Sequence, residues 1–117
     1  MKVIIAGSRS IEDKEIVYQA IAESKFEIDE VISGGAKGVD RIAEQWANEN
    51  GIPVCVVKPN WKLGRGAGLA NNQTMADQAD ALIAVYDGKS KGTKDMIDTM
   101  RRKGKNIFTK MHRPPAE

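Results

Sequence analysis

The sequence has few of the residues that form disulfides or bind metal ions. It holds one cysteine, Cys55, and one histidine, His112, which excludes an internal disulfide and a His/Cys cluster with metal-ligand spacing. Cys55 lies in an apolar run, and we expect it to be a small core residue. No apolar run approaches the roughly 20 residues of a membrane span, and the N-terminus does not have the pattern of a signal peptide. We therefore expect a cytoplasmic protein with no metal, no cofactor and no membrane partner.

Aromatic residues and excess charge are also scarce. Aromatic residues make up 5% of the 117 residues, and the formal net charge is only +2. Proteins that bind nucleic acid usually carry a clustered basic face, often with aromatic side chains among the charges. The hydrophobic content of 41% and the charged content of 29% are ordinary for a globular protein. The length suits one domain with a single core, and nucleic acid is not the expected partner.

Five short apolar segments alternate with helical patterns along the chain. The segments are four to six residues long at their cores, rich in β-branched residues and apolar on both faces, as buried parallel strands are. The strand candidates are residues 2–6, 30–35, 53–59, 80–88 and 105–110. A first helix is expected to begin at Ser10 with Asp13 as its capping-box partner, and a second to end at Asn50-Gly51. The alternation predicts an α/β fold with a mostly parallel five-stranded sheet flanked by helices.

Glycines and cations gather in the turns that follow the strands. In parallel sheets, ligands bind beyond the carboxyl ends of the strands, which is the edge where these turns lie. A glycine turn that opens onto a helix exposes backbone N–H groups at the positive end of the helix dipole. Neither GxxxxGK[ST] nor GxGxxG is satisfied, and tight turns favour glycine in any case. Three such turns on one edge nevertheless predict an anion-binding site.

Several stretches together resemble a known superfamily. They are "VIIAGSRS", "SGGAKGVDRIAEQWA" with "GIPV", "GRGAGLANNQTMADQADALIAVYDGKSKGT" and the closing "GKNI". In order and spacing they are similar to the SLOG superfamily, and within it to the small YspA-like branch that is common in phages and bacteria. The resemblance covers about residues 1–109. It implies a SLOG-like Rossmann-like nucleotide-binding domain over residues 1–109, with residues 110–117 as a flexible tail.

The resemblance also implies a class of ligand. The superfamily includes the "lonely guy" phosphoribohydrolases and DNA-processing protein A, and its members take nucleotides or nucleotide derivatives and often form dimers. It therefore implies a nucleotide-derived small-molecule ligand, a homodimer, and a location in the cytoplasm of a bacterium or a phage-infected host. If the protein is an enzyme, the resemblance implies a nucleoside 5′-monophosphate N-glycosidase.

The resemblance can be carried to single residues. The phosphoribohydrolases hold a phosphate with a paired-glycine turn that Gly34, Gly35 and Gly38 match. Where they have an arginine, this chain has Asn71, and their glutamate would fall at Met96. Hydrolysis of an N-glycosidic bond needs a carboxyl group to assist the leaving base or to stabilise the oxocarbenium ion. Asp40, Asp87 and Asp95 are the carboxylates considered for that role, and Asp95 and Asp40 are the predicted catalytic residues.

The remaining predicted site residues come from the glycine turns and their flanks. Arg9 and Arg65 are candidates for phosphate contacts because an arginine fork suits phosphate. Trp61 is expected either to stack on a base or to wedge its loop against the sheet, and Trp46 to lie in the core or a dimer interface. The predicted ligand-binding residues are Gly7, Ser8, Arg9, Ser33, Gly34, Gly35, Lys37, Gly38, Asn71, Asp87, Gly88, Gly92 and Thr93.

Two classes of function remain open on the sequence alone. The first is binding of a nucleotide or nucleotide-derived small molecule, such as a nucleoside monophosphate or an ADP-ribose-like compound, with or without N-glycosidic hydrolysis. The second is single-stranded nucleic-acid binding, by similarity to DNA-processing protein A. The small net charge and the lack of aromatics in the basic turns favour the first.

Overall fold

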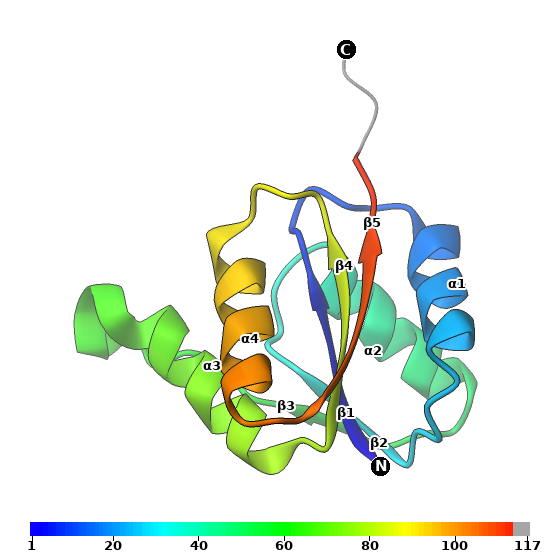
Figure 1. Ribbon diagram of the computed structural model, residues 1–117, viewed down its shortest axis with the longest axis horizontal. Coiled ribbons are helices and arrows are strands. Elements are labelled where there is room, and N and C mark those ends of the chain that lie inside the picture. The colour runs from blue at the N-terminus through cyan, green and yellow to red at the C-terminus, as the bar shows by residue number, and fades with distance from the viewer. Residues whose placement is uncertain (114–117) are drawn as a thin grey trace.

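The apolar segments form one parallel sheet. The computed structural model describes residues 1–113, and its five strands lie in the order β3-β2-β1-β4-β5 with every pairing parallel. This confirms the predicted α/β fold with a five-stranded sheet (Figure 1). The strands are β1 Lys2–Gly7, β2 Glu30–Ser33, β3 Val54–Val56, β4 Ala81–Tyr86 and β5 Asn106–Met111.

Four α-helices cover the two faces of the sheet. Helices α1 (Lys14–Ser24) and α2 (Val39–Glu49) pack on one face, and α3 (Ala67–Gln78) and α4 (Lys91–Arg102) pack on the other (Figure 1). The alternation of β1 divides the core in two, because Val3 and Ile5 join the first face and Ile4 joins the second. Within residues 1–113, no helix combines the length and the hydropathy that a membrane span requires.

Local chemistry moves some of the expected boundaries. Helix α1 begins at Lys14 with Asp13, not Ser10, as its N-cap, because the Asp13 carboxylate accepts hydrogen bonds from the backbone N–H groups of Glu15 and Ile16. Strand β5 continues to Met111, so the expected boundary at residue 109 falls inside a strand. Residues 114–117 of the expected tail lie outside the described residues. Cys55 is half-buried beside the core of the second face.

The strand order places a crevice between β1 and β4. From β1 the chain moves outward through β2 to β3, and it then returns to the other side of β1 to form β4 and β5. Parallel sheets bind ligands at such a reversal, beyond the carboxyl ends of the strands. The two strand ends are held close together there, since a Cβ at Gly7 would lie 2.0 Å from the Val85 carbonyl oxygen. The turns after β1 and β4 therefore flank the crevice.

Candidate functional site

A cleft of about 820 Å³ opens at the carboxyl edge of the sheet. Its walls come from the turns after β1, β2 and β4, from α3, and from η1 (Trp61–Gly66), a short 3-10 helix that precedes α3. Pockets of this size suit a small-molecule ligand. The cleft lies at the strand-order reversal, where the fold alone would place a ligand.

Hydrogen bonds in the turn after β4 hold the N-terminus of α4 at one end of the cleft. The Asp87 carboxylate accepts hydrogen bonds from the backbone N–H groups of Lys89 (2.8 Å) and Ser90 (3.0 Å). These bonds, the one to Lys89 first, hold the pKa of Asp87 below its ordinary value. Ser90 is the N-cap of α4 and accepts from the Thr93 N–H. Among the described residues, no hydrogen bond occupies the backbone N–H groups of Lys91 and Gly92, which remain for a ligand at the positive end of the dipole.

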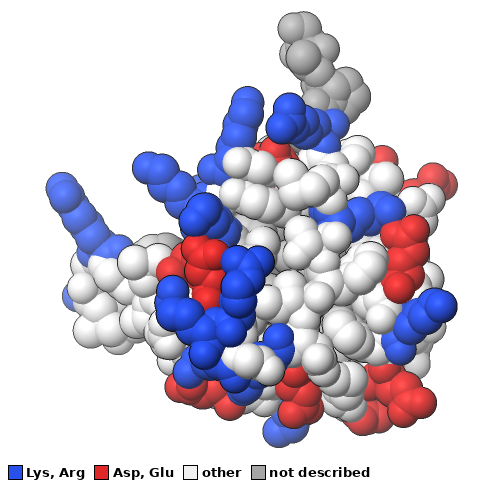
Figure 2. All heavy atoms as spheres, viewed as in Figure 1, with Lys and Arg blue, Asp and Glu red and all other residues white. Residues whose placement is uncertain are grey.

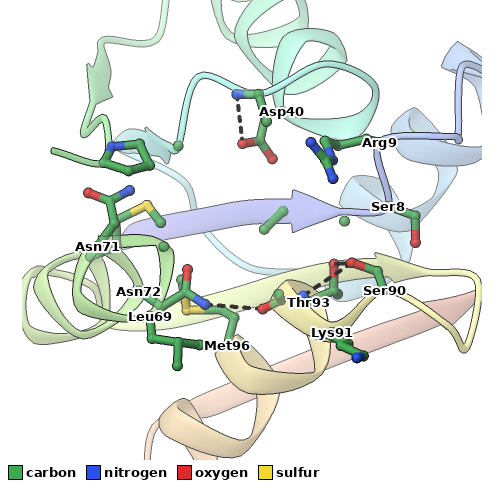
Figure 3. A pocket seen from close by; sticks show the side chains of 18 of the residues that line it. Ser8, Arg9, Asp40, Leu69, Asn71, Asn72, Ser90, Lys91, Thr93 and Met96 are labelled. Carbon is green, nitrogen blue, oxygen red and sulfur yellow. Dashed lines mark hydrogen bonds between the residues drawn. The ribbon is translucent and has the colours of Figure 1, made fainter. Parts of the chain in front are cut away.

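Ser8 connects the turn after β1 to the turn after β4. Its backbone N–H donates to the Val85 carbonyl, and its hydroxyl oxygen accepts from the Asp87 N–H at 3.1 Å. The Ser10 hydroxyl donates to the Asp87 carboxylate from the same turn. Arg9 lies between these bonded residues, and its exposed side chain lines the cleft on the side of β1 that carries Asp40 (Figure 3). The two turns therefore form one rigid cationic end.

Asp40 faces the cleft from the first turn of α2 (Figure 3). Only 7% of its surface is exposed, and its Oδ2 atom accepts a hydrogen bond from the Ala36 N–H at 3.1 Å. Burial raises the pKa of Asp40 to about 6, the charge of Glu44 adds to the rise, and the hydrogen bond from Ala36 opposes it. The group therefore changes its protonation state near neutral pH, which is what general acid–base chemistry requires.

Two asparagines of α3 connect the cleft wall to its neighbours. The Asn71 Nδ2 atom donates to the Val57 carbonyl at 2.7 Å. The Asn72 Nδ2 atom donates to the Gly92 carbonyl (3.1 Å) and to the Asp95 carboxylate (2.9 Å). Since both partners of Asn72 are oxygens, they fix the orientation of its amide, and its Oδ1 atom points into the cleft (Figure 3). Asp95 is thus engaged by α3 and does not line the cleft.

The cleft brings together more than half of the predicted site residues. Those that line it are Gly7, Ser8, Arg9, Gly34, Asp40, Asn71, Asp87, Gly92 and Thr93. Arg65 and Trp61 line it as well, and Trp61 is 71% exposed and is not wedged against the sheet. Those that do not line it are Ser33, Gly35, Lys37, Gly38, Gly88 and Asp95.

Three of the predicted residues outside the cleft, Ser33, Gly35 and Gly38, have structural roles nearby. The Ser33 hydroxyl donates to Glu44 and accepts from the Gly35 N–H. Gly38 has a positive φ of 74°, and a Cβ on it would lie 2.7 Å from the carbonyl oxygens of Ser8 and Arg9. The glycine is required there because the turns after β1 and β2 contact each other through their backbones.

Sequence reasoning missed most of the α3 contribution. Gly68, Asn72 and Met75 line the cleft together with Asn71, at the i, i+3, i+4 and i+7 spacing of one helical face. The spacing is visible in the sequence, but of these four residues only Asn71 was among the predicted ligand-binding residues. Met96 lies in the cleft at the position where the phosphoribohydrolase glutamate was expected. Within residues 1–113, no three His, Cys, Asp or Glu side chains gather in a way that would hold a metal ion.

Comparisons with known proteins identify the family of the chain and agree with its fold. The chain belongs to the SLOG superfamily, in the YspA, cpYpsA-related SLOG family, whose model matches residues 1–64. The Gene 61 protein of Mycobacterium phage D29 is 31% identical to it over 113 residues, which span 88% of this chain and 90% of that protein. These findings confirm the family resemblance.

Two solved structures share the fold. DNA processing protein A (DprA) of Streptococcus pneumoniae superposes on 92% of this chain with a TM-score of 0.74 and 20% identity. The chain spans about half (49%) of the length of that protein. TM1055, a target of the Northeast Structural Genomics Consortium, superposes on 91% of this chain and 71% of its own, with a TM-score of 0.66 and 19% identity. At these identities the likeness is one of fold.

Proposed function

We propose that this protein binds a nucleotide or nucleotide-derived small molecule, such as a nucleoside monophosphate or an ADP-ribose-like compound, in the cleft at the carboxyl edge of the sheet. The observation that carries the proposal is the convergence of the α4 N-terminus and the cationic turn after β1 at one end of a single cleft. Membership of the SLOG family supports the same class of ligand.

The charges around this end suit a phosphate group. Arg9, Lys89 and Lys91 line the cleft, and the Asp87 carboxylate between them in the sequence accepts three hydrogen bonds, from its own turn and from Ser10. A phosphate there would accept from the backbone N–H groups of Lys91 and Gly92 and would pair with the cations. Figure 2 shows basic side chains at the top of the molecule, where the strands end, with little acid among them.

Any N-glycosidic hydrolysis in this cleft would depend on Asp40. Asp87 is held ionised by its hydrogen bonds, and Asp95 is bound to Asn72 outside the cleft. Asp40 lines the cleft and has a pKa near 6, so it is the carboxyl group suited to protonate a leaving base. Because Met96 and Asn71 replace the phosphoribohydrolase glutamate and arginine, we expect turnover below about 1 s⁻¹ on common nucleoside monophosphates.

A thermal-shift titration tests the binding proposal. Nucleoside monophosphates of the common bases and ADP-ribose should stabilise the parent protein. Lys91→Ala should reduce that stabilisation, because it removes a cation beside the α4 N–H groups. Lys94→Ala is the matched control, since this lysine lies on the same helix, does not line the cleft and pairs with Asp98. Equal ligand effects in parent and Lys91→Ala, or no stabilisation by any of these compounds, would contradict the proposal.

Chromatography of the same mixtures tests hydrolysis. Free base released slowly by the parent and not by Asp40→Asn would assign the chemistry to Asp40. Turnover of about 1 s⁻¹ or faster would show that the missing glutamate is not needed. The homodimer implied by the family resemblance stays a prediction, which sedimentation velocity of the purified chain tests.

A further inference from the structure

The end of the cleft away from the α4 N-terminus is open to solvent and carries exposed apolar side chains together with Arg65. Trp61 is 71% exposed and Leu69 is 54% exposed, and both line the cleft together with the half-buried Pro59. Exposed apolar side chains scattered singly are common, but a group of them in the wall of a cleft indicates a binding surface. These residues form the second end of the site.

The two ends belong to different parts of the fold. The cationic end is built by the turns after β1 and β4, whereas the apolar end is carried by η1 and the first turn of α3. Figure 1 shows η1 and the start of α3 projecting from the body of the protein as an arm. In Figure 3, Leu69 and Asn71 lie at one end of the cleft and Ser90 and Lys91 at the other. The arm therefore adds an apolar wall to a site whose opposite end is charged.

The polar groups between the ends limit the kind of ligand that fits. Asp40 and the Oδ1 atom of Asn72 both point into the middle of the cleft (Figure 3). Both present an oxygen to groups that donate hydrogen bonds, such as sugar hydroxyls. The cleft therefore suits a ligand with an anion at one end, hydrogen-bond donors in the middle and a flat apolar group at the other end. A nucleoside monophosphate lying along the cleft has these three features.

We propose that Trp61, supported by Leu69 and Pro59, stacks on the base of a nucleotide whose phosphate lies at the N-terminus of α4. The proposal rests on the proposed function and adds the orientation of the ligand and a residue that recognises the base. Stacking on an aromatic side chain is tolerant of base identity because every base has a π-face. Trp61 therefore contributes affinity for nucleotides as a class.

The two tryptophans of the chain allow a direct measurement. Trp46 is partly buried against the core of the first face, so Trp46→Phe leaves Trp61 as the only tryptophan that reports fluorescence. AMP should quench or shift the Trp61 emission of this variant. Ribose 5-phosphate has the same phosphate and sugar but no base, so it should bind without that change. GMP, CMP and UMP complete the panel.

Affinities measured by calorimetry then isolate the contribution of the side chain. Trp61→Ala should weaken binding of the nucleotides by about 5- to 150-fold and leave ribose 5-phosphate within about twofold. Trp61→Phe should restore most of the loss. Leu63→Ala is the matched control, because Leu63 lies on the same 3-10 helix and is 67% exposed but does not line the cleft.

The possible failures are distinguishable. Nucleotides that bind the parent and Trp61→Ala equally would overturn the stacking proposal and leave the proposed function standing. If Trp61→Ala also converts a dimer to a monomer in sedimentation velocity, with nucleotide affinity unchanged, Trp61 belongs to an interface between copies. If the parent binds none of the four nucleotides, ribose 5-phosphate or ADP-ribose, the proposed function fails and the stacking proposal fails with it.

Discussion

At Asp40, burial and hydrogen bonding act on one carboxyl group in opposite directions. Burial dominates and raises the pKa of Asp40 from its ordinary 3.8 to about 6. The folded state therefore binds more protons than the unfolded state between about pH 4 and pH 6. The stability that the protonated group provides is fully present below about pH 4 and is lost as the pH rises through about 6. The shift corresponds to about 3 kcal/mol that ionised Asp40 costs at pH 7.

Asp40→Asn removes this ionisation while keeping the shape of the side chain. We expect the variant to be more stable than the parent at pH 7 by about 1–3 kcal/mol and no more stable at pH 4. Urea denaturation of both proteins at pH 4, 5.5 and 7 measures the difference. Asp87→Asn is a control with the opposite expected sign. Because the pKa of Asp87 is lowered, loss of its ionised carboxylate should destabilise the protein at pH 7. A difference between parent and Asp40→Asn that does not change with pH would contradict the expectation.

The glycines after β2 show what sequence reasoning reaches and where it stops. Their concentration at the carboxyl edge placed the cleft at the right edge of the sheet, because glycine tolerates close backbone approach. The sequence did not show which part of the protein or which ligand lies close to each of these glycines. Gly38 contacts the backbone of Ser8 and Arg9, and only Gly34 of this turn's glycines lines the cleft, beside the Asp40 carboxylate. Contacts between turns that are distant in sequence depend on the strand order, which local spacing does not encode.

The arm joins the body of the protein through α3, whose buried residues combine apolar packing with one polar contact. The residues that α3 buries include two alanines, and its Asn71 is 8% exposed with its Nδ2 atom 2.7 Å from the Val57 carbonyl. Such a bond matters because the carbonyl loses its donor when the amide is removed. We therefore expect Asn71 to hold the segment between β3 and η1 that leads to Trp61.

Asn71→Ala should destabilise the protein by about 1–3 kcal/mol and increase amide hydrogen exchange over residues 57–66. Gln73→Ala on the same helix should change the stability by no more than about 0.5 kcal/mol, since Gln73 is exposed. Denaturation and exchange measured by mass spectrometry give both quantities. Equal exchange over residues 57–66 in the two variants would show that the arm is held by other contacts.

Elements were predictable where a strong periodicity of apolar residues marks them. All five strands lie where the β-branched segments predicted, with ends within a few residues. The 3-10 helix η1, which follows β3, was not predicted. Gly64 and Gly66 interrupt any helical pattern there, and Gly64 has a positive φ of 79°. The start of α1 was misplaced because Ser10 and Asp13 are both good N-cap residues, and only the structure shows that Ser10 is engaged by Asp87.

Charge is unevenly distributed over the protein despite its net value of +2. Basic side chains predominate on the side that carries α3 and α4, and acidic side chains predominate on the opposite side (Figure 2). Several of the cations on the first side are paired, such as Lys94 with Asp98 and Lys103 with Asp77. Pairing of this kind lowers the field that a nucleic-acid strand would meet. A ligand with one or two phosphates in the cleft needs no extended basic surface.

Salt dependence therefore separates a small ligand from a polynucleotide. A nucleoside monophosphate neutralised at one end of the cleft should lose affinity only shallowly as salt rises. A single strand that follows the protein surface would show a slope of roughly 0.7 in log affinity against log salt for each phosphate contact. We expect AMP to bind with a slope of about 2 or less and an unstructured 20-mer to bind weakly or not at all. Titrations at four salt concentrations from about 50 to 400 mM measure both slopes. An oligonucleotide slope equivalent to five or more contacts, without binding of any mononucleotide, would assign the protein to single-stranded nucleic-acid binding.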